Sequence, residues 1–109
     1  MIQMKESNKF GINTTCVHVG EVRDEQFKGA VSPIYTSTSY AFNGVDVKRY
    51  PRYFNTPNQE MLRKKIAALE KTEDALIFGS GMGAISAALF AFLQKGDHVV
   101  VQQVIYGGT

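Results

Sequence analysis

The stretch ALIFGSGMGAISAALFAFLQKGDHVVVQ, residues 75–102, decides the fold class of this chain. A short apolar segment, 75–78, precedes a glycine-containing turn at 79–81, and a segment rich in small apolar residues covers 82–94. A second short apolar segment follows at 98–102. This order predicts a strand, a helix and a second strand, and the uninterrupted apolar runs indicate a parallel sheet covered on both faces. The sequence therefore predicts an α/β fold with a mostly parallel sheet.

A further helix is predicted upstream, where Thr56-Pro57-Asn58-Gln59 carries a helix-start signal. Threonine suits the N-cap, proline suits the first helical position, and Gln59 completes a capping box. The apolar residues that recur at helical spacing on one face are Met61, Leu62, Ile66 and Leu69. The basic run at 63–65 falls elsewhere and is predicted to be a solvated face.

Residues 1–55 show little helical periodicity and are rich in turn-forming and β-branched residues. They are predicted to form an extended amino-terminal arm that lies on another surface, and residues 56–109 to begin a larger domain. The ending Ile105-Tyr-Gly-Gly-Thr109 has no closing helix or polar tail. We therefore expect this chain to be the amino-terminal part of a larger protein, truncated at its carboxyl end.

Composition excludes several classes of protein. Of the 109 residues, 44% are hydrophobic, which is typical of a globular protein rather than a disordered one. The net charge of +2 is too small to indicate a nucleic-acid partner, and the single cysteine, Cys16, allows no internal disulfide. The longest nearly apolar run, 84–93, is half the roughly 20 residues that span a bilayer. A cytoplasmic protein without a membrane segment or metal-ligand spacing is expected.

The turn Gly79-Ser80-Gly81-Met82 lies between a predicted strand and a predicted helix start. Free N–H groups of a first helical turn, together with the helix dipole, suit a phosphate. The alternative interpretation is a turn that only requires glycine. A dinucleotide fingerprint would expect an acid near Gln102, and a P-loop would expect a lysine after the glycines. A nucleotide-binding domain and a smaller phosphorylated cofactor both remain open.

Two other places are candidates for ligand binding. Pro51 favours extended backbone at Tyr50, so the side chains of Tyr50 and Arg52 are predicted to point the same way and to bind a phosphate together. The alternative is a surface cluster of cation and aromatic groups with Tyr53. Tyr106 follows the second predicted strand, where ligands of open α/β sheets bind, and it is either a stacking residue or an aromatic plug.

Short motifs along the chain carry a resemblance when taken together. They are Thr15-Cys-Val-His18-Val-Gly20, Gly29-Ala-Val-Ser-Pro33-Ile34-Tyr-Thr-Ser-Thr38, Tyr50-Pro-Arg52, Ala67-Ala-Leu-Glu70, Ser80-Gly81-Met82 with Ala84-Ile85, and Tyr106-Gly-Gly-Thr109. From about Thr14 to Thr109 the chain resembles the amino-terminal third of the pyridoxal-phosphate enzymes of cysteine and methionine metabolism. These include cystathionine γ-synthase, γ-lyase and β-lyase.

The resemblance implies a role for each matching residue. The N–H groups of Gly81 and Met82 would hold the cofactor phosphate. Tyr50 and Arg52 would reach the same phosphate from a neighbouring subunit. Tyr106 would stack on the pyridine ring and assist proton transfer or leaving-group departure, which makes it the catalytic candidate.

The resemblance also implies the fold, the activity and the oligomeric state of the complete protein. The fold would be the amino-terminal portion of a fold-type I pyridoxal-phosphate-dependent transferase, with a large domain like that of aspartate aminotransferase. The activity would be elimination or replacement at Cβ or Cγ of a sulfur amino acid such as cystathionine, or of activated homoserine with cysteine. The protein would be a homotetramer built as a dimer of dimers.

Three departures from the family pattern matter. The family shows Gly-Asn-Pro-Thr after the arginine, whereas Phe54-Asn55-Thr56-Pro57-Asn58 stands here, so Asn55 receives no role. Gly108 occupies a place where methionine γ-lyases carry cysteine, which favours other members. No lysine of this chain stands in the Ser-x-Thr-Lys context of the Schiff-base lysine. The 109-residue chain alone is therefore expected to be inactive, and a non-catalytic relative remains an alternative.

Overall fold

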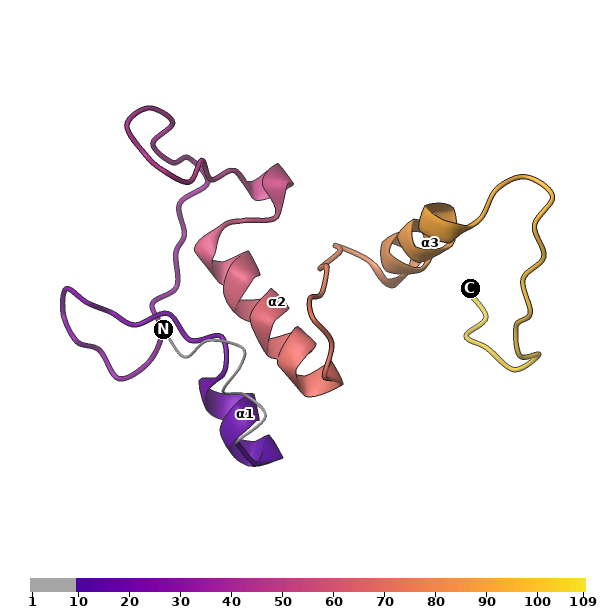
Figure 1. Ribbon diagram of the computed structural model, residues 1–109, viewed down its shortest axis with the longest axis horizontal. Helices are drawn as coiled ribbons and strands as arrows, with labels where there is room; N and C mark the ends of the chain where they lie inside the picture. Colours follow the sequence, from indigo (N-terminus) through magenta and orange to yellow (C-terminus); the bar gives the residue numbers. More distant parts are fainter. Residues whose placement is uncertain (1–9) are drawn as a thin grey trace. The chain divides into compact units, whose positions relative to one another are not determined.

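The computed structural model describes residues 10–109, which fall into two compact units with the boundary between Ile77 and Phe78. The first unit carries two α-helices and a 3-10 turn, and the second carries one α-helix (Figure 1). The elements are, in chain order, α1 (Ile12–His18), η2 (Pro51–Tyr53), α2 (Pro57–Glu70) and α3 (Gly81–Phe92).

Helix α2 begins where its capping signal predicted. Thr56 has extended backbone, and Gln59 Oε1 accepts from the Thr56 N–H at 3.1 Å and from Thr56 Oγ1 at 2.9 Å. Thr56 is also one of the buried polar residues of the described part, at 8% exposure. The helix ends at Lys71, which adopts a left-handed conformation with φ 57°. The predicted helix start is confirmed.

The burial of α2 differs from the predicted face. Ala67 is completely buried, whereas Leu62 and Ile66 remain 47% and 41% exposed. The basic run is not simply solvated either, because Arg63 pairs with Asp74 at 3.2 Å and Lys65 donates to a carbonyl of α1. The periodicity predicted the position of the helix. Which of its residues is buried depends on the segments that pack against it, including α1.

Helix α1 was not predicted, because its residues INTTCVH carry no apolar stripe and no side-chain cap. It lies beside α2 in the first unit (Figure 1), and Lys65 Nζ donates to the Val17 carbonyl at 2.9 Å. Thr15 and Val19 are buried there. Such a short helix depends on packing rather than on propensity. The extended structure predicted for 1–55 does not hold at 12–18, and residues 1–9 lie outside the described part.

Helix α3 fills most of the predicted interval 82–94, and extended backbone at Leu93 ends it. The turn that follows is closed by Asp97, whose Oδ2 accepts from the Gln94 N–H at 2.7 Å. Neither predicted strand, 75–78 or 98–102, is a strand in the described structure. A strand exists only through ladder hydrogen bonds to a neighbour, and an apolar run cannot supply that neighbour by itself.

Candidate functional site

The start of α3 leaves two backbone donors free. Ser80 is the N-cap, and its Oγ accepts from the Gly83 N–H at 3.0 Å while its carbonyl accepts from the Ala84 N–H at 3.1 Å. Within residues 10–109, the N–H groups of Gly81 and Met82 have no hydrogen-bond acceptor. Both lie at the positive end of the helix dipole. The donor set therefore fits a phosphate group.

The space around this turn is open as well. A Cβ atom built at Gly79 or Gly81 would meet nothing within 4 Å, and Met82 is 44% exposed. Neither glycine has a positive φ. The turn therefore does not need glycine for its backbone conformation, which disfavours the alternative interpretation. Without a Cβ at these positions, a ligand can approach the backbone closely.

Tyr50 and Arg52 lie in a tighter turn than predicted. Tyr50 has the extended backbone that Pro51 favours, with φ −154° and ψ 137°. Arg52, however, is the middle residue of the 3-10 turn η2. The side chains of Tyr50 and Arg52 therefore do not have the spacing of an extended chain, because a 3-10 turn rotates successive side chains by about 120°. Arg52 is exposed, and the ring of Tyr50 packs edge-on against Tyr53 with centroids 5.3 Å apart.

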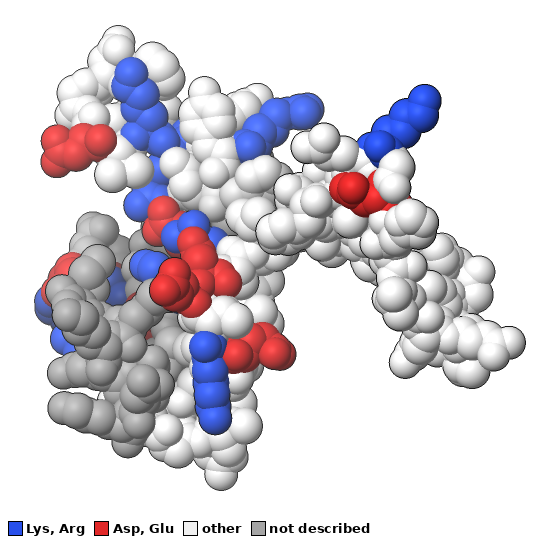
Figure 2. All heavy atoms as spheres, turned by 45° about the vertical axis from the view of Figure 1, so that its right-hand side comes forward, with Lys and Arg blue, Asp and Glu red and all other residues white. Residues whose placement is uncertain are grey.

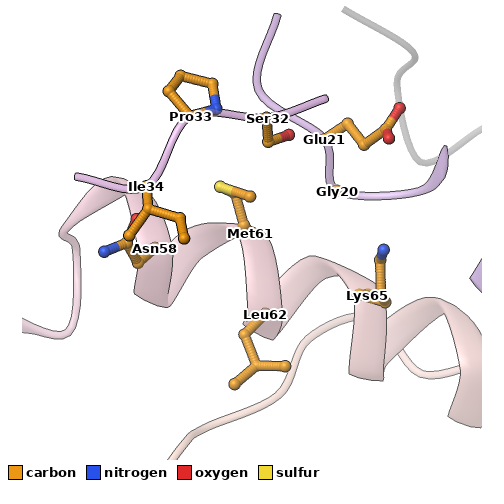
Figure 3. A pocket seen from close by; sticks show the side chains of 9 residues that line it. All are labelled: Gly20, Glu21, Ser32, Pro33, Ile34, Asn58, Met61, Leu62 and Lys65. Carbon is orange, nitrogen blue, oxygen red and sulfur yellow. The ribbon is translucent and has the colours of Figure 1, made fainter. Parts of the chain in front are cut away.

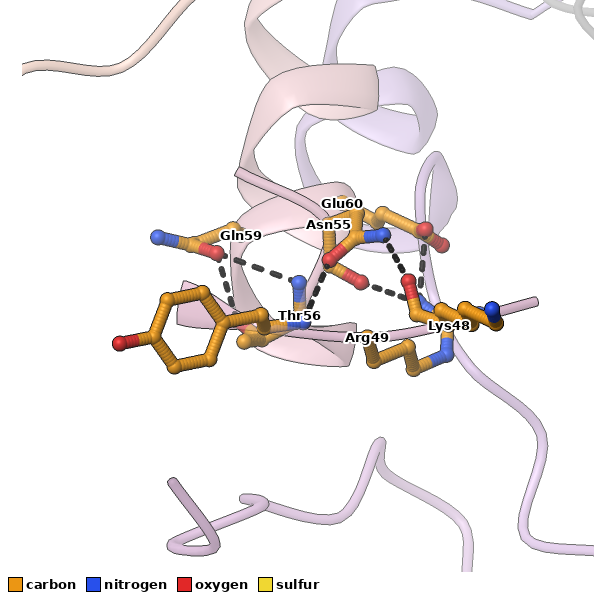
Figure 4. A network of polar contacts seen from close by, with 7 residues as sticks. Lys48, Arg49, Asn55, Thr56, Gln59 and Glu60 are labelled. Carbon is orange, nitrogen blue, oxygen red and sulfur yellow. Dashed lines mark hydrogen bonds and ion pairs between the residues drawn. The ribbon is translucent and has the colours of Figure 1, made fainter. Parts of the chain in front are cut away.

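A polar network ties this turn to α2, and its centre is Asn55 (Figure 4). Asn55 Oδ1 accepts from the Tyr50 N–H at 3.0 Å, and Asn55 Nδ2 donates to the Lys48 carbonyl at 2.7 Å. The Arg49 guanidinium donates to the Asn55 carbonyl and, at 2.7 Å, to Glu60 Oε1. The sequence did not predict this role of Asn55. The available signal was its residue type, since asparagine in a turn commonly bonds to nearby backbone.

Tyr106 belongs to the last turn of the chain. The Thr109 N–H donates to the Tyr106 carbonyl at 2.8 Å, and the tyrosine is 83% exposed. A Cβ at Gly108 would stand 2.7 Å from Cε1 of the ring. Glycine at 108 therefore lets the ring lie against the backbone. The stacking and aromatic-plug interpretations of Tyr106 both remain predictions.

The predicted site residues fall into three local groups. Tyr50 and Arg52 share one turn of the first unit, whereas Gly81 and Met82 share the first turn of α3. Tyr106 lies in the second unit as well. A single site formed by all three groups is therefore proposed and not observed.

The first unit also contains an open pocket of about 460 Å³ between α2 and the segments before it (Figure 3). It contains none of the predicted site residues. Its lining residues are Gly20, Glu21, Ser32, Pro33, Ile34, Asn58, Met61, Leu62 and Lys65.

Charged side chains of both signs are interspersed on the face that Figure 2 shows. Residues 78–109 contain just two residues of the Lys, Arg, Asp and Glu types, Lys95 and Asp97. Over the described residues, no group of three or more His, Cys, Asp or Glu could hold a metal ion. No described helix is both long enough and apolar enough to cross a bilayer.

Comparison with known proteins extends over nearly the whole chain. Residues 13–109 match the family described as Cys/Met metabolism PLP-dependent enzyme. An L-methionine gamma-lyase of Fusobacterium nucleatum subsp. polymorphum is 36% identical over 95% of this chain and 29% of its own length. A cystathionine gamma-synthase of Mycobacterium tuberculosis is 41% identical over 91% of this chain and 26% of its own length. An O-acetyl-L-homoserine sulfhydrylase of Corynebacterium glutamicum is 32% identical over 94% of this chain and 26% of its own length. The chain thus spans less than a third of the length of these curated relatives.

Proposed function

Because this chain belongs to the family of PLP-dependent enzymes of Cys/Met metabolism, we propose that the protein eliminates or replaces groups at Cβ or Cγ of sulfur amino acids. The family depends on pyridoxal phosphate. The observation that carries the proposal is the pair of free N–H groups at Gly81 and Met82, in an open helix start.

In this proposal the first turn of α3 holds the cofactor phosphate. Gly81 and Met82 donate their N–H groups, and Ser80 keeps the turn in shape through its bond to Gly83. The helix dipole adds to the attraction. When bound, the cofactor supplies an electron-accepting ring that stabilises negative charge at Cα. The role of this turn is to fix the orientation of the ring.

We assign the second phosphate contact to Tyr50 and Arg52 of a neighbouring subunit. Arg52 is exposed and has no hydrogen-bond partner among residues 10–109, so its guanidinium is available for bidentate binding. Such sharing requires an oligomer, and we propose a homotetramer built as a dimer of dimers. Tyr106 would cover the cofactor ring, which its 83% exposure permits.

We extend the proposal to the parallel sheet that the sequence predicts. Helix α3 has no buried residue, and Phe90 and Phe92 are more than 80% exposed. An apolar helix of this kind requires covering layers. We infer that segments 75–78 and 98–102 pair in the mostly parallel sheet of a fold-type I large domain.

The proposed substrates are cystathionine, or activated homoserine with cysteine. The relatives named above include a lyase, a synthase and a sulfhydrylase, so their names support an amino-acid substrate of this class without selecting one reaction type. Gly108 favours members other than methionine γ-lyases. Cys16 is an exposed free thiol, which supports placing the reaction in the reducing cytoplasm.

Cofactor titration tests the proposal. The full-length protein should bind pyridoxal phosphate saturably, with a near-ultraviolet absorbance change, and should either release 2-oxobutyrate or pyruvate from cystathionine or form cystathionine from activated homoserine and cysteine. Saturable binding of NAD without binding of pyridoxal phosphate would contradict it and would favour the nucleotide-binding alternative.

The variant Arg52→Ala tests the arm. We expect it to weaken pyridoxal phosphate binding by about 1.5–3 kcal/mol, the scale of a charged hydrogen bond. The matched control is Arg23→Ala, which removes another exposed arginine of the first unit. Equal dissociation constants for Arg52→Ala and the wild type, measured by equilibrium dialysis, would remove Arg52 from the site.

A further inference from the structure

The side chain of Asn55 uses both ends of its amide on the chain that enters η2. Its oxygen accepts from the Tyr50 N–H at 3.0 Å, and its nitrogen donates to the Lys48 carbonyl at 2.7 Å (Figure 4). Tyr50 is the residue that caps the turn carrying Arg52. The amide therefore closes a loop around the two residues assigned to the cofactor phosphate.

A second layer of bonds anchors Asn55 itself to α2. Arg49 donates to the Asn55 carbonyl and pairs with Glu60 at 2.7 Å. The Arg49 and Glu60 side chains are only 28% and 24% exposed, so this ion pair is partly shielded from solvent. Gln59 Nε2 also donates to the Pro51 carbonyl at 3.0 Å. The turn is thus fixed to the first turn of α2.

The turn needs such support because its backbone is strained. Phe54, directly after η2, has φ 55° and ψ 31°, a left-handed conformation. For an L-residue other than glycine, this conformation costs about 1–2 kcal/mol. Without the bonds to Asn55, the turn can relax and displace the side chains it carries.

We propose that Asn55 is a positioning residue, which holds Tyr50 and Arg52 in the arrangement that binds the phosphate of the cofactor. The inference rests on the proposed function, since it takes from it the role of the turn. Asn55 acts only through the turn and makes no contact with the phosphate.

Asn58 provides a matched control within the same first unit. Its amide accepts from the Tyr35 N–H at 3.0 Å and donates to the Tyr35 carbonyl at 2.6 Å. It makes the same two kinds of bond as Asn55 but holds a different segment. Asn58→Ala therefore removes equivalent bonds and leaves η2 intact.

The test measures binding of pyridoxal phosphate by the full-length protein. We expect Asn55→Ala to raise the dissociation constant about tenfold, since the binding-competent turn becomes a minor population. Asn58→Ala should change it by less than about twofold, the experimental scale of a neutral substitution away from the site. If Asn55→Ala does not fold, Asn55→Asp keeps the acceptor for the Tyr50 N–H but replaces the donor to Lys48 with an oxygen that repels its carbonyl, and it should raise the dissociation constant more than Asn58→Ala does.

A double-mutant cycle separates positioning from general stability. Adding Asn55→Ala to Arg52→Ala should weaken binding further by less than the tenfold loss expected in the wild-type background, because one of the two residues that Asn55 positions is already absent and only its effect through Tyr50 remains. Additive effects, or equal losses for Asn55→Ala and Asn58→Ala, would overturn the positioning role. An Arg52→Ala variant with unchanged affinity would instead overturn the proposed role of the arm.

Discussion

At the scale of single residues, short polar side chains organise the first unit by bonding to backbone. Asn55 and Asn58 each bond to one backbone N–H and one backbone carbonyl of another segment, through the two ends of an amide. Asp24 organises a nearby loop with its carboxylate, which accepts from the N–H groups of Phe27 at 2.9 Å, Gln26 at 3.1 Å and Gly29 at 3.3 Å. Such side chains replace the ladder bonds that a loop lacks.

The Asp24 loop has a predictable response to acid. The bond from the Phe27 N–H, aided by those from Gly29 and Gln26 and opposed by partial burial, lowers the pKa of the Asp24 carboxyl. A lowered pKa in the folded state means that the carboxylate stabilises the loop fully above the usual Asp pKa of about 3.9, and that this contribution is lost as the pH falls through the lower folded value.

Carboxyl carbon shifts measured by NMR against pH should therefore give a midpoint for Asp24 below the usual Asp value. The amide shifts of Phe27 and Gly29 should follow the same curve. In Asp24→Asn, these amide shifts should lose that transition. A midpoint at or above the usual value would show that the three N–H bonds do not form in solution.

At the scale of elements, the chain between α1 and α2 turns at a glycine. Gly20 has φ +84°, and a Cβ there would lie 2.5 Å from the Met61 carbonyl oxygen and 3.3 Å from the Lys65 nitrogen. Both atoms belong to the backbone of α2, which cannot yield as a flexible side chain can. The contact between the two helices thus depends on the missing side chain at 20.

Gly20→Ala should therefore destabilise the first unit more than Gly44→Ala. Gly44 also has a positive φ, +69°, but a Cβ there would meet nothing within 4 Å. We expect Gly44→Ala to cost about 1–2 kcal/mol from backbone conformation alone. Gly20→Ala should cost about 1–3 kcal/mol more from overpacking. Urea unfolding of both variants measures the difference, and equal losses would contradict the close approach of the helices.

At the scale of the whole molecule, the chain is rich in apolar surface and poor in core. The buried hydrophobic residues of the described part are Val19 and Ala67. The remaining apolar side chains, including those of α3, require surfaces that these residues do not provide to one another. This agrees with a chain that spans under a third of its relatives' length.

The 109-residue chain by itself should turn over no sulfur amino acid. None of its lysines stands in the Ser-x-Thr-Lys context that the family resemblance implies for the lysine that anchors the cofactor. Incubation with pyridoxal phosphate and cystathionine should release no pyruvate or 2-oxobutyrate, with a family member of full length as the positive control. Sustained release by the 109-residue chain would contradict this expectation.

What could be predicted from sequence depended on the range of the interaction. The capping box at Thr56 and Gln59 and the extent of α3 were predicted correctly, because caps and apolar runs act within a few residues. The geometry at Arg52 was predicted wrongly, since the 3-10 turn depends on bonds from Asn55 and Gln59 farther along the chain. The strands at 75–78 and 98–102 stay a prediction for the complete sheet.

The sequence by itself determined the family, the start of α2 and the glycine-rich turn before α3, because each is encoded in adjacent residues. Only the tertiary structure decided that α1 exists, that Ala67 is the buried residue of α2, and that Asn55 holds the turn of Tyr50 and Arg52. These features arise where separated segments meet, as when Lys65 reaches the carbonyl of Val17. Their energies depend on the partner, which no local pattern specifies.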